Sequence, residues 1–128
     1  WTLKGSGGGT ARELVLGTDA TERVRLNSSG FIIGSGGTAI TKHLSATATL
    51  DFADTAAGTV TDLTITVTGA ASGDEVSIGV PAASVPASGS YFGWVSAADT
   101  VTIRFSNNAL IASYDPASGA FRASVTKH

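Results

Sequence analysis

The stretch DFADTAAGTVTDLTITVTGAASGDEVSIGVP, residues 51–81, decides the fold class of this chain. Aliphatic residues alternate with threonine at residues 63–68, and apolar and polar residues alternate again at 76–80, after the turn-forming sequence SGD at 72–74. A period of two residues places successive side chains on opposite faces of a strand, which is the pattern of a half-buried strand. The stretch therefore predicts two strands that are joined by a tight turn.

The same alternation recurs before and after this stretch, at residues 44–52, 101–105 and 121–125. Turn-forming sequences separate these segments at intervals that are typical of a sandwich or barrel, and no segment has the three-to-four residue spacing of an amphipathic helix. We therefore expect an all-β fold, an antiparallel and jelly-roll-like β-sandwich over residues 38–128. The residues expected to face its interior include Leu63, Ile65, Val67, Ile78, Val101, Ile103, Phe105, Phe121, Ala123 and Val125.

Residues 1–37 differ from the rest, because glycine-containing breaks separate short apolar pieces. The unit LGTDATERVRLNSSGFIIGSG, residues 16–36, suggests two brief strands and a turn, with the turn chemistry at residues 27–30. Such strands are too short to bury a face by themselves, so we expect a shaft or linker that packs between chains. The residues expected at this interface are Leu14, Leu16, Phe31 and Ile33.

Composition excludes several classes of function. The formal net charge is −2, and only 14% of the residues are charged, so the chain lacks the basic field that nucleic-acid binding requires. No segment approaches the roughly 20 apolar residues of a membrane span, so we expect no membrane insertion. The chain has no cysteine for disulfides or zinc-thiolate sites. It also has no methionine and opens at Trp1, from which we expect a fragment of a longer protein or a matured product.

No catalytic or metal-binding pattern stands out. Asp51 and Asp54 lie at a strand end and residues 74–75 lie at a turn, where carboxylates are ordinarily solvated. His43 and His128 have no second ligand at metal spacing. We therefore expect neither an enzyme nor a bound metal or cofactor.

The sequence SYFGWVS, residues 90–96, contains a cluster of three aromatic residues within four positions. Strand alternation directs Tyr91 to one face and Phe92 and Trp94 to the other, so at least one ring lies at a surface or an interface. An exposed ring beside asparagine amides suits a sugar, although a subunit contact or a core position explains the rings equally well. The residues predicted to contact a ligand are Tyr91, Trp94, Asn107, Asn108 and Tyr114.

Three longer sequences resemble a known family: TAITKHLSATATLDFADTAAGTVTDLTITVTGAASGDEVSIGVP at residues 38–81, WVSAADTVTIRFSN at 94–107 and DPASGAFRASVTK at 115–127. Together they resemble the C-terminal head domain of tailed-bacteriophage fibre and spike proteins. The preceding LGTDATERVRLNSSGFIIG, residues 16–34, is similar to segments of phage fibre shafts.

The resemblance implies a homotrimer, made in the host cytoplasm and carried on the virion, in which an intertwined Gly-rich β shaft precedes three sandwich heads. Its heads would attach to a bacterial surface polysaccharide or protein, and its N-terminal side would contact other virion proteins. The alternative is a capsid head fibre or cement (decoration) protein with a purely structural role, which would face the capsid around Trp1 and Leu3. A depolymerase spike is disfavoured, because the chain is too short for a long repetitive β-helix.

Overall fold

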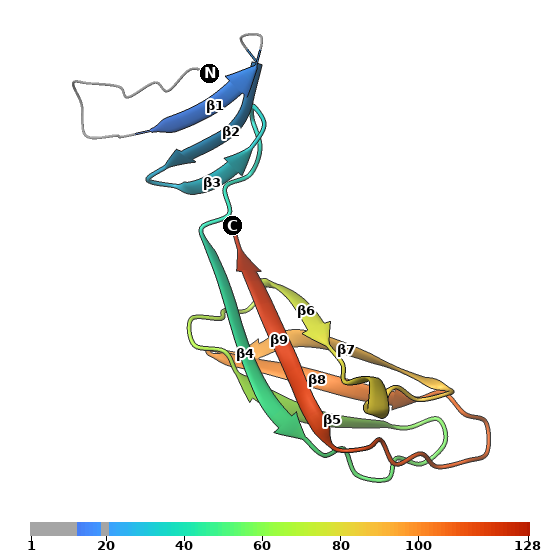
Figure 1. Cartoon of the computed structure of the whole chain (residues 1–128). Coiled ribbons are helices and arrows are strands. Elements are labelled where there is room, and N and C mark those ends of the chain that lie inside the picture. The colour runs from blue at the N-terminus through green and yellow to red at the C-terminus, as the bar shows by residue number, and fades with distance from the viewer. Residues whose placement is uncertain (1–12, 19–20) are drawn as a thin grey trace. The chain divides into compact units, whose positions relative to one another are not determined.

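The computed structural model describes residues 13–18 and 21–128, and their regular secondary structure is almost entirely β-strand, in antiparallel sheets (Figure 1). The chain divides into two compact units. One comprises the residues up to His43 together with Thr126–His128, and the other comprises Leu44–Val125. The domain boundary expected between residues 37 and 38 stays a prediction. Trp1 and Leu3, which the capsid alternative places at the capsid, lie outside the described residues.

The first unit contains one three-stranded antiparallel sheet in the order β1 (Leu14–Thr18), β2 (Thr21–Asn27) and β3 (Gly30–Ile33). The turn between β2 and β3 is stabilised by Asn27, whose side-chain oxygen accepts a hydrogen bond from the backbone N–H of Ser29 at 2.9 Å. Gly30 has a φ of 134°, which favours glycine. The turn expected from the sequence is therefore present, and β1 is a third strand beyond the two that were expected.

The second unit is a sandwich of two three-stranded sheets. The first has the order β4 (Lys42–Leu50), β9 (Gly119–Lys127) and β6 (Glu75–Gly79). The second has the order β5 (Val60–Thr66), β8 (Thr100–Asn107) and β7 (Gly89–Ala97), with both pairings antiparallel. One 3₁₀ turn, Ala82–Ser84, is the only helical element in the part of the chain that the structure describes. The all-β sandwich expected from the sequence is confirmed.

Four aromatic rings make the centre of the sandwich. Phe52 contacts Tyr91 and Phe121 edge-on at centroid distances of 5.5 Å, and contacts Phe105 at 6.2 Å. Aliphatic side chains from both sheets surround these rings, and the predicted interior residues are buried or partly buried. The buried hydrophobic residues of this core are Leu50, Phe52, Ile65, Val67, Ala70, Val95, Val101, Ile103, Phe105, Phe121, Ala123 and Val125.

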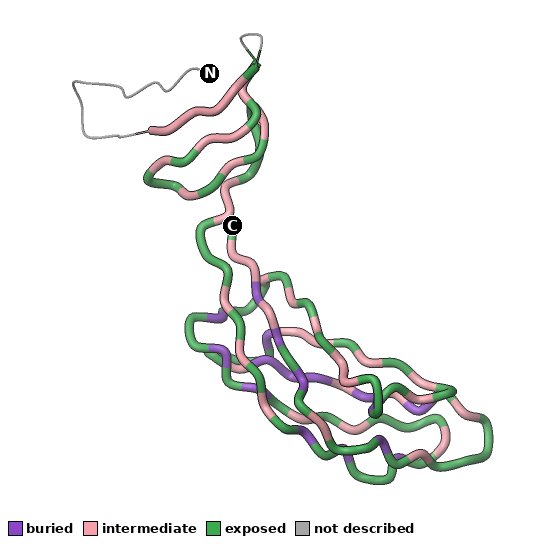
Figure 2. Tube along the Cα trace, in the orientation of Figure 1, coloured by how far each residue is buried: buried purple, intermediate pink, exposed green. Residues whose placement is uncertain are grey.

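Burial is distributed unequally along the chain (Figure 2). Every described residue that is buried belongs to the sandwich, and none of the described residues of the first unit is buried. The sandwich therefore has a hydrophobic core of its own, whereas the three-stranded sheet of the first unit has none within one chain.

Candidate functional site

The outward face of the β5–β8–β7 sheet carries a cluster of aromatic and charged side chains. Cross-strand register places Asp62 of β5, Arg104 of β8 and Phe92 of β7 in one row. Trp94 follows on the same face, two residues after Phe92, and its ring stacks on the Phe92 ring at a centroid distance of 5.7 Å and an interplanar angle of 28°. We call these four residues the aromatic platform.

Arg104 contacts the other three residues of the platform, the Asp62 carboxylate and the Phe92 and Trp94 rings. Its Nε and Nη2 donate hydrogen bonds to the two carboxylate oxygens of Asp62, both at 2.6 Å. Its guanidinium also lies 5.0 Å from the centroid of the Trp94 ring and 5.7 Å from that of Phe92, which is the geometry of a cation–π contact. The hydrogen bonds from Arg104 lower the pKa of the Asp62 carboxyl, so the pair stays ionised at neutral pH.

The platform is accessible from solvent. The Phe92 side chain is 48% exposed, and the Asp62 and Arg104 side chains are partly exposed. Thr102, which lies opposite Trp94 in the register, is buried although it is on the outward face, and it donates a hydrogen bond to Ser96 Oγ at 2.7 Å. The platform is thus a pair of stacked rings with the Arg104 guanidinium over both, and the Asp62 carboxylate is bound to that guanidinium.

Tyr91 points the other way, as alternation predicted. Its ring packs against Phe52, Phe105 and Phe121 in the core, and its hydroxyl donates a hydrogen bond to the Ser84 carbonyl at 2.9 Å. This position corrects the expectation that Tyr91 contacts a ligand, because its ring is committed to the core and its hydroxyl to the backbone.

Burial of the Tyr91 hydroxyl has a consequence at alkaline pH. Desolvation, with a smaller contribution from Tyr114, raises the pKa of Tyr91 to about 12 from 10.0. The unfolded chain therefore loses this proton at lower pH than the folded chain, so the stabilisation is complete below pH 10 and is lost as pH rises toward 12.

Urea unfolding at pH 8 and pH 11 should show a smaller loss of stability for Tyr91→Phe than for the unmodified chain. Equal losses in the two proteins would contradict this assignment.

Asn107 is also a structural residue. It is 1% exposed, and its amide nitrogen donates to the carbonyls of Thr55 and Ala112 at 2.8 and 2.9 Å, while its side-chain oxygen accepts from the Ala109 N–H at 3.0 Å. The expectation that its amide faces a ligand is therefore wrong. Both amide hydrogens are used to hold the loop that follows β8.

Asn108 and Tyr114 flank that loop. Asn108 is exposed, and its side-chain oxygen accepts a hydrogen bond from Ser106 at 3.0 Å. Tyr114 is partly buried, with its ring 6.0 Å from that of Phe105 and its backbone paired with Thr55. Of the five predicted ligand residues, Trp94 alone belongs to the aromatic platform, while Asn108 remains accessible beside the loop.

The loop between these residues exposes two aliphatic side chains that the sequence did not single out. Leu110 and Ile111 are each 95% exposed. Asn107 holds one base of the loop, and the Thr55–Tyr114 bridge holds the other, with N–H to carbonyl distances of 2.9 and 3.0 Å. Two adjacent, fully exposed aliphatic residues on a fixed loop are unusual on a surface that is otherwise rich in Ser and Thr.

A second surface is the apolar side of the β1–β2–β3 sheet. Register aligns Leu14 with Leu26 and Phe31, and aligns Leu16 with Val24 and Ile33, so all six side chains lie on one side of the sheet. We call these six residues the apolar face. Leu26, Phe31 and Ile33 are 44%, 38% and 64% exposed, so nothing within one chain covers them fully. The four residues that the sequence predicted for an interface lie together here, and Val24 and Leu26 complete the surface.

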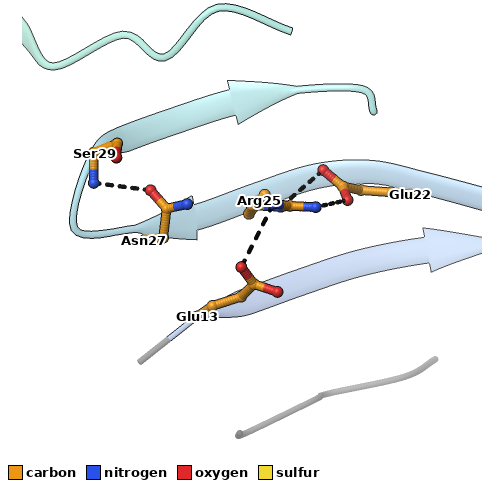
Figure 3. Close-up of polar contacts among 5 residues, drawn as sticks. All are labelled: Glu13, Glu22, Arg25, Asn27 and Ser29. Carbon is orange, nitrogen blue, oxygen red and sulfur yellow. Dashed lines mark hydrogen bonds and ion pairs between the residues drawn. The ribbon is translucent and has the colours of Figure 1, made fainter. Parts of the chain in front are cut away.

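The opposite side of the same sheet carries the charged side chains of Arg25, Glu22 and Glu13 (Figure 3), and the register places Val15 and Ile32 on that side beside Arg25. Arg25 forms an ion pair and hydrogen bonds with Glu22, and its Nη1 lies 3.6 Å from a carboxylate oxygen of Glu13. These partners raise the pKa of the Arg25 guanidinium, which stays charged. One side of the sheet therefore carries the six residues of the apolar face, and the other combines a charged cluster with two aliphatic residues.

Within residues 13–18 and 21–128, no three His, Asp or Glu side chains are grouped so that they could hold a metal ion. No helix found there has the length and apolar character needed to cross a membrane. Comparisons with protein-family models, with curated proteins and with solved structures find no match to the chain. The aromatic platform, the apolar face and the loop with Leu110 and Ile111 each present exposed apolar side chains to a binding partner.

Proposed function

We propose that this chain is a homotrimeric structural protein of the bacteriophage virion, a tail fibre or spike whose sandwich head mediates attachment to the bacterial host surface. The observation that carries the proposal is the apolar face. None of the described residues of the unit that contains this face is buried within one chain. Six clustered apolar side chains are stable only if something covers them. Further copies of the same chain can bury this face, and they are present in equal amount wherever the chain is made.

A trimer fits this sheet and the resemblance to phage fibres. Three copies about a threefold axis can direct three apolar faces inward while their charged sides, with Arg25 and its partners, face water. Each chain then contributes one wall of a closed, dry interior, and the sandwiches become three linked heads. Three heads on one fibre raise effective affinity by about 10² to 10⁴ without any new contact, so weak contacts at each head suffice.

The aromatic platform supports attachment. Host recognition needs an accessible surface that does not depend on the core, and the platform lies on the outward face of the sheet opposite the aromatic centre. Enzymatic chemistry is not part of the proposal, and the chain acts by binding.

A capsid head fibre or cement protein is the second candidate. It is favoured by Leu110 and Ile111, because a pair of fully exposed aliphatic side chains suits a neighbouring protein better than a sugar. In that case the loop, and not the platform, makes the important contact.

Binding of the fluorescently labelled chain to a panel of bacterial strains tests the proposal and separates the two candidates. We expect strain-selective binding that is lost in a Phe92→Ala, Trp94→Ala double variant and kept in a Leu110→Ser, Ile111→Ser double variant. Both pairs are on the surface, so circular dichroism should show folded sandwiches in both. Absence of binding to every strain would contradict attachment and favour the capsid role.

A further inference from the structure

We propose that the aromatic platform binds uncharged hexopyranose units of a polysaccharide, and that it discriminates against the acidic counterparts of the same sugars. This inference rests on the proposed attachment function, and it specifies the chemical class of the ligand.

The rings supply the apolar half of the site. Phe92 and Trp94 are two residues apart on β7 and stack on one another at 5.7 Å, with the Arg104 guanidinium over both rings, and the 48% exposure of Phe92 leaves ring surface open to solvent. One face of a hexopyranose ring carries C–H groups, and these pack against the electron-rich face of an aromatic ring. Binding sites for small polar ligands commonly combine such aromatic surfaces with a few fixed polar groups.

Asp62 and Arg104 supply the polar half. Their two hydrogen bonds use two of the five guanidinium N–H donors, and each carboxylate oxygen can accept further hydrogen bonds. The pair therefore presents donors and acceptors side by side, which matches the neighbouring hydroxyl groups of a sugar. The mutual bonds also hold both side chains in place, so less conformational entropy is lost when a ligand binds.

Charge selects the uncharged sugars. Arg104 is the cation of the platform, and Asp62 already neutralises it. The other basic residue of Leu44–Val125 is Arg122, which lies on the other sheet, in β9, and donates to Ser45. Two basic against seven acidic residues give this unit a formal charge of −5, the acidic residues being Asp51, Asp54, Asp62, Asp74, Glu75, Asp99 and Asp115. An acidic polysaccharide would be repelled and would find no unpaired cation at the rings.

The shape of the surface suits a polymer. Exposed hydroxyl groups lie within and beside the platform, with Thr64 in the row of Trp94, and with Ser90 in the next row beyond Phe92, which also contains Ser106 and Val60. The platform is thus one part of an open, polar sheet face, along which an extended chain can lie. A small isolated molecule would be held by one side only.

The test compares polysaccharides in matched pairs that differ only at C6, each pair being a neutral hexose polymer and its uronic acid counterpart. Glucan, galactan and mannan are immobilised beside polyglucuronate, polygalacturonate and polymannuronate, and binding of the full chain is measured by biolayer interferometry at low and high NaCl. We expect at least one neutral polymer to bind about tenfold or more tightly than its acidic counterpart, a difference of about 1.4 kcal/mol. Its affinity should change less than about twofold with salt, because no net charge is paired on binding.

Variants locate the site. Trp94→Ala should weaken binding to that polymer by about tenfold or more, and Asp62→Asn should weaken it by a smaller factor, since it removes one acceptor and keeps the rings. The matched control, Leu110→Ser with Ile111→Ser, should bind like the unmodified chain. A preference for the uronic acid polymers, or no binding to any of the six, would overturn the inference.

The outcomes also separate this inference from the proposed function. Strain-selective binding to cells without binding to any of the six polysaccharides would refute the neutral-sugar site and leave attachment through a protein receptor in place. Binding to a neutral polymer by a chain that stays monomeric and binds no cell would refute the appendage and leave the site standing.

Discussion

Replacing Phe52 by alanine should lower the free energy of unfolding of the sandwich by about 3–5 kcal/mol. Phe52 is 1% exposed, and its ring contacts three other rings, those of Tyr91, Phe105 and Phe121. The substitution removes most of a large buried side chain and leaves a cavity between the two sheets, and these two losses add. Urea denaturation followed by circular dichroism, at one fixed protein concentration, measures the change.

Phe92 is the matched control for this prediction, because the same substitution is made on the same sandwich at a ring that is 48% exposed. Phe92→Ala should cost no more than about 1 kcal/mol, since it opens no cavity and removes one stacked partner of Trp94. Similar losses for the two variants would show that the core is not where the four rings place it.

Replacing Ile33 by lysine should convert the proposed trimer to monomer. Ile33 is 64% exposed in one chain, so lysine is tolerated when the chain is alone. In the proposed assembly the same position lies in a dry interior, where an unpaired ammonium group costs several kcal/mol in each subunit. Association should weaken by about a hundredfold or more, because each 1.4 kcal/mol is a factor of ten.

Size-exclusion chromatography with light scattering measures the mass of the Ile33→Lys variant beside a control of equal charge. Ser29→Lys places the same charge in the exposed turn between β2 and β3, away from the apolar face, and should remain trimeric. A trimeric Ile33→Lys variant would mean that another surface holds the chains together.

Much of the sandwich could be predicted from the sequence, because its strands are amphipathic. The alternation of Leu63, Ile65 and Val67 with threonine is sufficient to tell which side of β5 is buried. The strand β1 was less evident, since a glycine at residue 17 and a register shift after Leu16 interrupt its pattern. Short strands of this kind are recognised only once their partners are known.

The site was harder to predict than the fold, for a physical reason. Alternation places Phe92 and Trp94 on one face, but it does not say which side chain of the next strand lies beside them. Asp62 and Arg104 are 42 residues apart and meet through the β5–β8 register, which depends on both turns and the whole core. Asn107 was predicted to face a ligand but holds the loop after β8, because an asparagine near a strand end suits a surface position and a loop anchor equally well.

The central claim is that copies of this chain cover each other's apolar faces, and sedimentation equilibrium of the unmodified full chain tests it most directly. Measured from submicromolar to tens of micromolar concentration, the chain should behave as one species with three times the 12.8 kDa mass of a single chain. A mass of 12.8 kDa throughout that range would contradict the claim.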